Sequence, residues 1–108
     1  MGPSAYFVYT KCVFEWDPKK AAATLAKHGV TFGEAATVFA EPAALDGPDL
    51  GHSEVEARFI RLGRSFLNRV LTVAYTERKA SHGETIRLIS ARRASRKERT
   101  AYRSSAED

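Results

Sequence analysis

The chain has 108 residues, of which 44% are hydrophobic and 28% are charged, a composition typical of one soluble globular domain. It contains no run of about 18 apolar residues and no secretory leader, so we expect neither a membrane span nor export. Cys12 is the only cysteine, which excludes an intrachain disulfide and a cysteine-cluster zinc site and makes the reducing cytoplasm the expected location.

The net charge of +4 is distributed unevenly along the chain. Residues 1–57 carry a net charge of −4, whereas residues 58–103 carry +10. Arginine outnumbers lysine by eleven to six, and the planar guanidinium binds phosphate oxygens in pairs and stacks on bases. The second half of the chain therefore predicts a positive surface suited to nucleic acid or to an acidic protein.

The first predicted elements are a strand over residues 13–17 and a helix over residues 18–28. Asp17 is placed to cap the helix, and Pro18 occupies the first helical position, where its missing amide proton costs nothing. Gly29 can take the left-handed conformation that ends a helix.

A second helix is expected directly after this stop. Thr31 and Glu34 have the spacing of a capping box, and Pro42 ends the helical pattern. Between them an apolar stripe at helical spacing predicts a face packed on a core: Phe32, Ala35, Ala36 and Phe39.

The second half of the chain predicts three strands and a final helix. Residues 41–54 have the glycines, prolines and acidic residues of a loop. The strands that follow are expected over residues 57–64, 69–78 and 84–92, joined by short hairpin turns. Ser95 and Glu98 form another capping box, which opens a helix over residues 95–103. The predicted fold is α+β in the order β-α-α-β-β-β-α, with an antiparallel sheet.

The expected domain covers residues 12–103. Residues 1–11 are assigned to an N-terminal extension, whose first four residues resemble a cloning remnant, and residues 104–108 to a short tail. Neither a glycine-rich phosphate loop nor a nucleophile elbow is present. The acidic loop with Asp49 and His52 matches no metal cage, so we expect no metal and no cofactor.

The arginines carry the functional signal. Arg58, Arg61 and Arg87 lie on predicted strands, and Arg92 and Arg93 lead into the last helix. On that helix a single face repeats the charge at i, i+3 and i+7: Arg96, Arg99 and Arg103. One such side chain is usually just solvated, but the cluster predicts an anionic partner. Two tyrosines near these positions are either base-stacking surfaces or packed, half-buried side chains: Tyr75 and Tyr102.

Four stretches resemble the BrnT family of bacterial type II toxins: FEWDPKKAAATLAKHGVTFGEAATVFAEP (14–42), HSEVEARFIRLGRS (52–65), RVLTVAYTER (69–78) and IRLISARRASRKERTAY (86–102). The resemblance covers about residues 13–103. It implies a RelE-like microbial ribonuclease fold and a metal-independent endoribonuclease that cleaves RNA and inhibits translation. It also implies a BrnA-type ribbon–helix–helix antitoxin as partner, with operator DNA bound only through that antitoxin.

The resemblance also suggests roles for individual residues. Arg58 and Arg92 would hold the scissile phosphate and stabilise its developing charge, and His28, His52 and Tyr102 are the candidates for proton transfer. His28 equally fits a helix-end cation. Further RNA contacts are expected from six side chains: Arg61, Arg87, Arg93, Arg96, Lys97 and Arg99. The alternative is a non-catalytic basic module that binds RNA or DNA, or an inactive toxin homologue that acts only through its protein partner.

Overall fold

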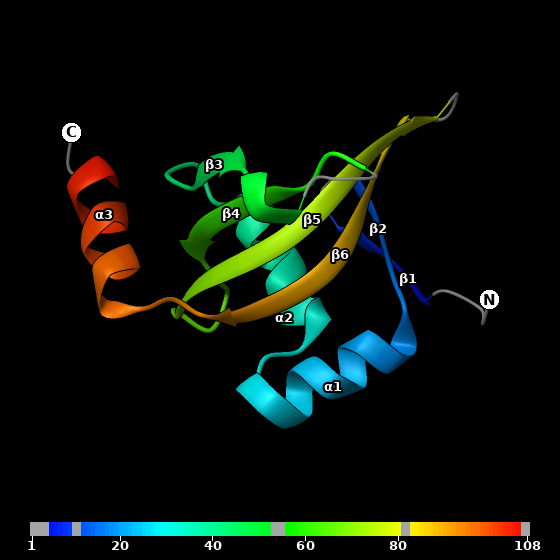
Figure 1. Ribbon diagram of the computed structural model, residues 1–108, viewed down its shortest axis with the longest axis horizontal. Coiled ribbons are helices and arrows are strands. Elements are labelled where there is room, and N and C mark those ends of the chain that lie inside the picture. Colours follow the sequence, from blue (N-terminus) through cyan, green and yellow to red (C-terminus); the bar gives the residue numbers. More distant parts are fainter. Residues whose placement is uncertain (1–4, 10–11, 53–55, 81–82, 107–108) are drawn as a thin grey trace.

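The computed structural model describes residues 5–9, 12–52, 56–80 and 83–106 (Figure 1). The elements in chain order are β1 (Ala5–Tyr9), β2 (Cys12–Trp16), α1 (Pro18–His28), α2 (Phe32–Thr37), the 3-10 turn η1 (Val38–Ala40), β3 (Leu45–Pro48), the 3-10 turn η2 (Leu50–His52), β4 (Phe59–Arg64), β5 (Val70–Ala80), β6 (Gly83–Arg93) and α3 (Arg96–Ala106). The α+β prediction is confirmed, and every predicted helix and strand has a counterpart. No helix in the described ranges is long and apolar enough to cross a membrane.

The sheet has six strands in the order β1-β2-β6-β5-β4-β3. The predicted order lacked β1 and β3, and the sheet is mixed rather than antiparallel, because β2 pairs with β6 in parallel. β3 forms within the predicted loop, where Leu45 pairs with Leu62 and Pro48 with Phe59. β3 was not predicted because its glycine and proline are typical of turns. Proline is tolerated there because β3 is an edge strand.

The predicted caps of α1 and α3 are confirmed. The Asp17 carboxylate accepts a hydrogen bond from the Lys19 backbone N–H at 2.9 Å, and Gly29 has the left-handed φ of 67°. At α3 the Ser95 N–H donates to Glu98 Oε1 at 2.8 Å, and the Glu98 N–H donates to Ser95 Oγ at 3.2 Å. Local side-chain chemistry therefore defines where both helices begin.

The capping box of α2 forms only by half. The Glu34 N–H donates to Thr31 Oγ1 at 3.0 Å, but the Glu34 carboxylate turns into the structure and binds two side chains of the β4–β5 turn region. It accepts from Ser65 Oγ at 2.6 Å and from both Arg69 Nε and Nη2. Arg69 also donates to the Gly29 carbonyl at 3.2 Å, so this network ties α1 and α2 to the sheet.

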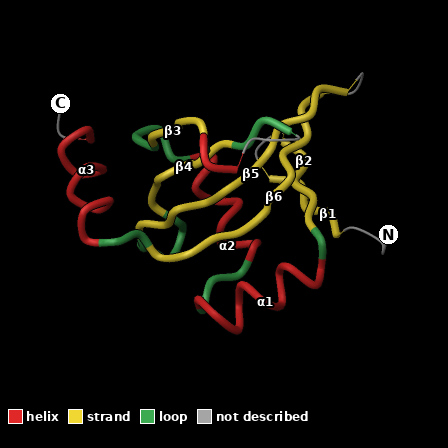
Figure 2. The backbone as a smooth tube through the Cα atoms, in the orientation of Figure 1, coloured by secondary structure: helices red, strands yellow, loops and turns green. Residues whose placement is uncertain are grey.

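One face of the sheet packs on α1, α2 and η1 to form the core. The Phe39 ring lies edge-on to Phe14, with centroids 5.2 Å apart, and edge-on to Tyr75 at 4.9 Å. Phe14 and Leu88 are fully buried on the same face. Figure 2 shows α1 and α2 beside the sheet and α3 beyond its β4–β5 end, far from α1. On the face opposite α1 and α2, which we call the open face, α3 contacts β4, the start of β5 and the end of β6, and the β5 side chains of this face are themselves buried.

Candidate functional site on the open face

A β-bulge in β6 decides which arginines share the open face. Ser90 pairs with Ala74 and Leu88 pairs with Tyr75, so Ile89 is an extra residue without a partner in β5. Arg87 and Arg92 are five positions apart and would point to opposite faces of an unbroken strand. Because the bulge reverses the alternation, Arg87 and Arg92 both project from the open face.

Arg87 belongs to a line of side chains that crosses the sheet. It pairs with Thr76 on β5 and with Glu15 on β2, and Glu15 in turn pairs with Tyr6 on β1. Residues in register on neighbouring strands point to the same face and lie about 4.8 Å apart. The four side chains therefore form one continuous line on the open face.

Arg58 extends this line beyond β5. Phe59 pairs with Tyr75, so the position before it lies opposite Thr76, and alternation turns Arg58 to the open face. The Arg58 carbonyl accepts from the Asp49 N–H at 2.8 Å, which holds the segment before β4 extended. We call these five residues the central row: Tyr6, Glu15, Arg87, Thr76 and Arg58.

Glu15 is the acidic member of the central row and is only 8% exposed. Its Oε1 lies 3.4 Å from Arg87 Nη1 and 3.6 Å from Arg78 Nη1. That oxygen accepts no hydrogen bond from any described residue. The arrangement places a buried carboxylate oxygen next to two guanidinium groups, a combination that sequence reasoning missed because Glu15 reads as one residue of a short apolar strand.

Arg92 is held by α3. Its Nη1 and Nη2 donate to the two carboxylate oxygens of Glu98 at 2.7 and 3.0 Å, and its side chain remains 44% exposed. The hydrogen bond from Arg92 lowers the pKa of Glu98 to about 2. Arg92 thus projects from the open face, but a phosphate there would have to share it with Glu98 or displace that carboxylate.

Arg61 and Arg93 lie on the face opposite the central row, since they pair with the core residues Val73 and Leu71. Arg61 Nε donates to the Val38 carbonyl at 3.0 Å, and its Nη1 binds the Asp46 carboxylate at 2.5 Å. These contacts fasten η1 and β3 to β4. Arg61, which was predicted as an RNA contact, thus holds tertiary structure together, and its side chain is only 17% exposed.

Tyr102 is buried rather than presented to a ligand. It is 3% exposed and packs with Val70 and Ala94, and its hydroxyl donates to Glu41 Oε1 at 2.6 Å. Burial and the bond to Glu41 raise the pKa of Tyr102. The side chain thereby anchors α3 at the end of the sheet, and the predicted proton transfer has no geometric support there.

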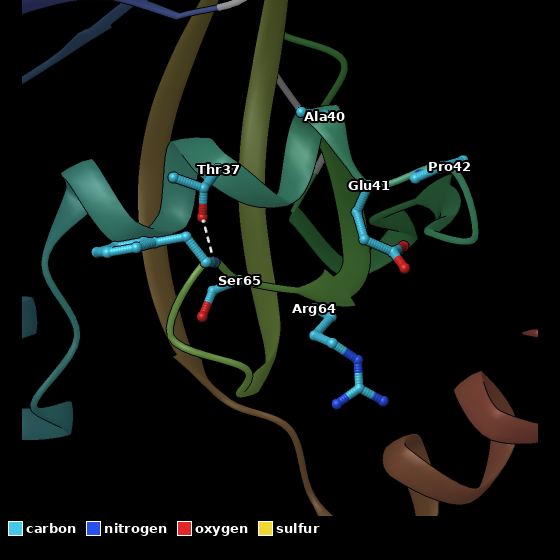
Figure 3. A pocket seen from close by; sticks show the side chains of 7 residues that line it. Thr37, Ala40, Glu41, Pro42, Arg64 and Ser65 are labelled. Carbon is cyan, nitrogen blue, oxygen red and sulfur yellow. Dashed lines mark hydrogen bonds between the residues drawn. The ribbon is translucent and has the colours of Figure 1, made fainter.

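Beside Tyr102 is a shallow pocket of about 280 Å³ that sequence reasoning did not anticipate. It is lined by seven residues: Thr37, Ala40, Glu41, Pro42, Arg64, Ser65 and Phe66. Figure 3 shows Arg64 reaching from β4 toward α3, where its guanidinium lies over the Tyr102 ring at 5.6 Å. Arg64 also donates to the Asn68 side chain at 2.8 Å.

The histidines are separated in the fold. His28 ends α1 on the helix-covered side of the sheet, whereas His52 ends η2, close in sequence to Asp49, which binds the Arg58 backbone. The His52 side chain and all of His82 lie outside the described residues. Within the part of the chain that the structure describes, no three His, Cys, Asp or Glu side chains cluster as metal ligands.

The predicted RNA contacts on α3 differ in exposure. Arg96 and Lys97 are exposed in the first turn, next to the Arg92–Glu98 pair. Arg99 is half-buried, and its Nη1 donates to the Ala94 carbonyl at 2.8 Å. Arg96 and Lys97 can therefore extend the positive surface beyond Arg92, while Arg99 stabilises the start of the helix.

The fold is shared with a small ribonuclease toxin of known structure. The 1.1 Å crystal structure of the Brucella abortus ribonuclease toxin BrnT matches with a TM-score of 0.54 and 23% sequence identity, over 75% of this chain and 94% of that chain. The model of the family described as the ribonuclease toxin BrnT of type II toxin–antitoxin systems matches residues 16–98. The chain therefore belongs to the BrnT family of ribonuclease toxins. No curated protein matches it.

Proposed function

We propose that this ribonuclease toxin binds and cleaves single-stranded RNA on the open face, with the central row as its catalytic centre. The observation that carries the proposal is the bulge at Ile89, which puts Arg92 on the same face as Arg87, Arg58 and the buried carboxylate of Glu15. Phosphate binding and proton acceptance are two of the functions that RNA cleavage requires of side chains, and the third is proton donation to the leaving oxygen.

The proposed reaction is an attack by the ribose 2′-oxygen on the adjacent phosphorus. Glu15 accepts the proton of the 2′-hydroxyl, the bond from O2′ to phosphorus forms, and the bond from phosphorus to O5′ breaks. The products are a 2′,3′-cyclic phosphate and a 5′-hydroxyl. Arg87 and Arg58 stabilise the charge that develops on the phosphoryl oxygens, because guanidinium groups bind two such oxygens at once.

The leaving 5′-oxygen needs a proton, and His52 is the predicted donor whose side chain lies outside the described residues and which no described contact assigns to another role. It follows Asp49 by three positions, and the Asp49 N–H binds the Arg58 carbonyl at 2.8 Å. His28 lies on the helix-covered side, and Tyr102 is buried against Glu41. We therefore assign acid catalysis to His52 and a structural role to the other two. The assigned chemistry uses only side chains of this protein and no metal.

The RNA is proposed to extend from the central row toward α3. Arg92 lies four β5 positions beyond Arg87, since their partners are Thr72 and Thr76, which corresponds to about 13 Å along the sheet. Arg96 and Lys97 follow in the first turn of α3. Arg61 and Arg93 are omitted from this path because they lie on the other face.

The type II class implies a cognate antitoxin, and we propose a BrnA-type protein with a ribbon–helix–helix DNA-binding region. It would neutralise the toxin by covering the positive open face with an acidic segment. Operator DNA would be bound through the antitoxin alone. We place this exchange in the cytoplasm, where the toxin inhibits translation by cutting RNA.

Induced expression without antitoxin tests the proposal. Wild type should arrest growth and produce RNA fragments with cyclic phosphate ends, and Arg87→Ala and Glu15→Gln should do neither. Arg103→Ala is the matched control, because Arg103 is exposed in the last turn of α3 and outside the proposed path. The assignment fails if both site variants cleave like wild type. A wild type that binds RNA without cutting it would instead support the non-catalytic basic module.

A further inference from the structure

Strand β1 brings an exposed aromatic side chain to the edge of the proposed catalytic centre. It lies outside the family match at residues 16–98 and pairs in antiparallel register with β2, so that Tyr6 is directly opposite Glu15. Tyr6 is 66% exposed. Its ring therefore borders the carboxylate that we assign as the base.

The other side of β1 explains why Tyr6 faces outward. Phe7 turns to the helix-covered face, where its ring centroid lies 6.4 Å from that of Trp16, and the Trp16 ring lies edge-on to Phe32 at 5.8 Å. Because side chains alternate along a strand, this anchor places Tyr6 and Val8 on the open face. Val8 is 70% exposed.

The spacing of the row brings a nucleotide within reach of the Tyr6 ring. Strands lie about 4.8 Å apart, so the Cα atoms of Tyr6 and Arg87 are separated by roughly 10 Å across β2. An RNA phosphate bound by Arg87 would leave its base near β1. Proteins that bind single-stranded RNA on a sheet stack unpaired bases on aromatic side chains of the exposed face.

We infer that Tyr6 forms a base-stacking subsite for one unpaired nucleobase next to the scissile phosphate. The ligand is a base of single-stranded RNA, and no particular base is selected, because every base offers a π-face to the ring. The inference rests on the proposed function in that it uses the same face, but it concerns binding and can be tested without cleavage.

The direct test measures the affinity of a 2′-O-methyl oligonucleotide, which has no 2′-hydroxyl to react, by fluorescence anisotropy. Tyr6→Ala should weaken binding by about 5- to 150-fold, the range for loss of one stacked base. Tyr6→Phe should stay within about twofold of wild type, because the ring is kept. Val8→Ala, on the same strand and face, is the matched control and should bind like wild type.

Three further readouts separate stacking from a structural effect. A 2-aminopurine base in the oligonucleotide should be quenched by wild type and by Tyr6→Phe but not by Tyr6→Ala. Trp16 is the only tryptophan of the chain, so its emission reports whether Phe7 still packs on it and β1 remains in place. The slope of the logarithm of affinity against the logarithm of salt concentration should not change in Tyr6→Ala, since stacking releases no counterions. Arg87→Ala should reduce the magnitude of this slope by about 0.7.

The inference is overturned if Tyr6→Ala binds RNA like wild type, or if Tyr6→Phe loses as much affinity as Tyr6→Ala. It is also overturned if Tyr6→Ala weakens only antitoxin binding or self-association, which would make β1 a protein-pairing edge. Failure of the proposed function looks different: Arg87→Ala would leave cleavage unchanged, whatever the result at Tyr6.

Discussion

The pair formed by Arg92 and Glu98 provides the sharpest test of how stability and RNA binding share one side chain. Glu98→Gln keeps the shape of the side chain and an oxygen that can accept from the Ser95 N–H, but it removes the negative charge that Arg92 binds with both Nη atoms. We expect the variant to be less stable and to bind RNA more tightly, because Arg92 then becomes available to a phosphate.

The size of the stability loss follows from the pKa of Glu98. A fall from 4.5 to about 2 corresponds to about 3.4 kcal/mol at 1.36 kcal/mol per pKa unit. Arg92 is 44% exposed, and solvent screens such a pair, so we expect about 1–2 kcal/mol. In a domain of this size each kcal/mol of lost stability lowers Tm by roughly 4–8 °C.

The sign of the pH dependence is determined by the lowered pKa. Because the folded-state pKa of Glu98 lies below its unfolded value, its contribution is fully present above about pH 4.5 and is lost as the pH falls toward 2. Urea unfolding of wild type and Glu98→Gln should therefore differ at pH 7 and converge near pH 2. RNA affinity measured across salt concentrations should show a slope steeper by about 0.7 in the variant, for one added phosphate contact.

The contribution of the Arg92–Glu98 pair to stability and the contribution of Arg92 to RNA binding can be refuted separately. Equal stability of the two proteins at pH 7, or a difference that persists unchanged at pH 2, would show that the ion pair does not stabilise the attachment of α3. An unchanged salt slope would show that Arg92 does not contact RNA and serves only as an anchor. Arg92→Ala is the control, since it should lower stability without steepening the slope.

Three other predictions test the site and its support. Glu15→Gln should lower the cleavage rate by about 10²- to 10⁴-fold, as expected for loss of a general base, while RNA affinity in a binding assay stays close to wild type; an equal loss of affinity would contradict the role. Arg69→Ala leaves the buried Glu34 carboxylate without its guanidinium, so urea unfolding at pH 7 should show a loss of about 3–5 kcal/mol. In the wild type the pKa of Glu34 is lowered, although burial alone would raise it, because Arg69 and Ser65 bind the carboxylate. The loss of stability in Arg69→Ala should therefore shrink as Glu34 is protonated at acid pH. A pH-independent loss would refute the account. Gly63→Ala would put a Cβ 3.0 Å from the Ala44 Cβ and should lower the free energy of unfolding by about 1–3 kcal/mol, measured by thermal unfolding. Unchanged stability would show that the segment around Ala44 moves away freely.

The helices were predictable because their signals are local. Asp17 with Pro18, Gly29, and Ser95 with Glu98 each act within one helical turn, and the structure confirms each of them. The edge strands β1 and β3 were not predictable, because short edge strands form mainly by pairing with a neighbour. β3 in particular contains the turn-like residues Gly47 and Pro48 and pairs with β4 over four positions.

In the candidate site, too, some features were predictable from the sequence and others depended on strand pairing. The excess of arginine and the family resemblance pointed to a phosphate-binding surface, but they did not separate Arg87 from Arg61, which lie on opposite faces of the sheet. Glu15 lies within the stretch 14–42 that carries the family resemblance, but nothing in the sequence marked it as a site residue. Its proximity to Arg87 arises from the parallel pairing of β2 with β6, two strands that most of the chain separates.

The sequence by itself determined the chemistry that is available to this protein: guanidinium groups in excess, one domain, a helix pair and a strand meander, and membership of a ribonuclease toxin family. Only the tertiary structure decided which of those groups lie on the same face of the sheet. The physical reason is that side chains alternate between the two faces of a strand, so a single extra residue, Ile89 in β6, reverses the direction of every side chain after it. Because of that bulge Arg92 projects from the same face of the sheet as Arg87. The sequence alone presents these residues as a run of equivalent arginines.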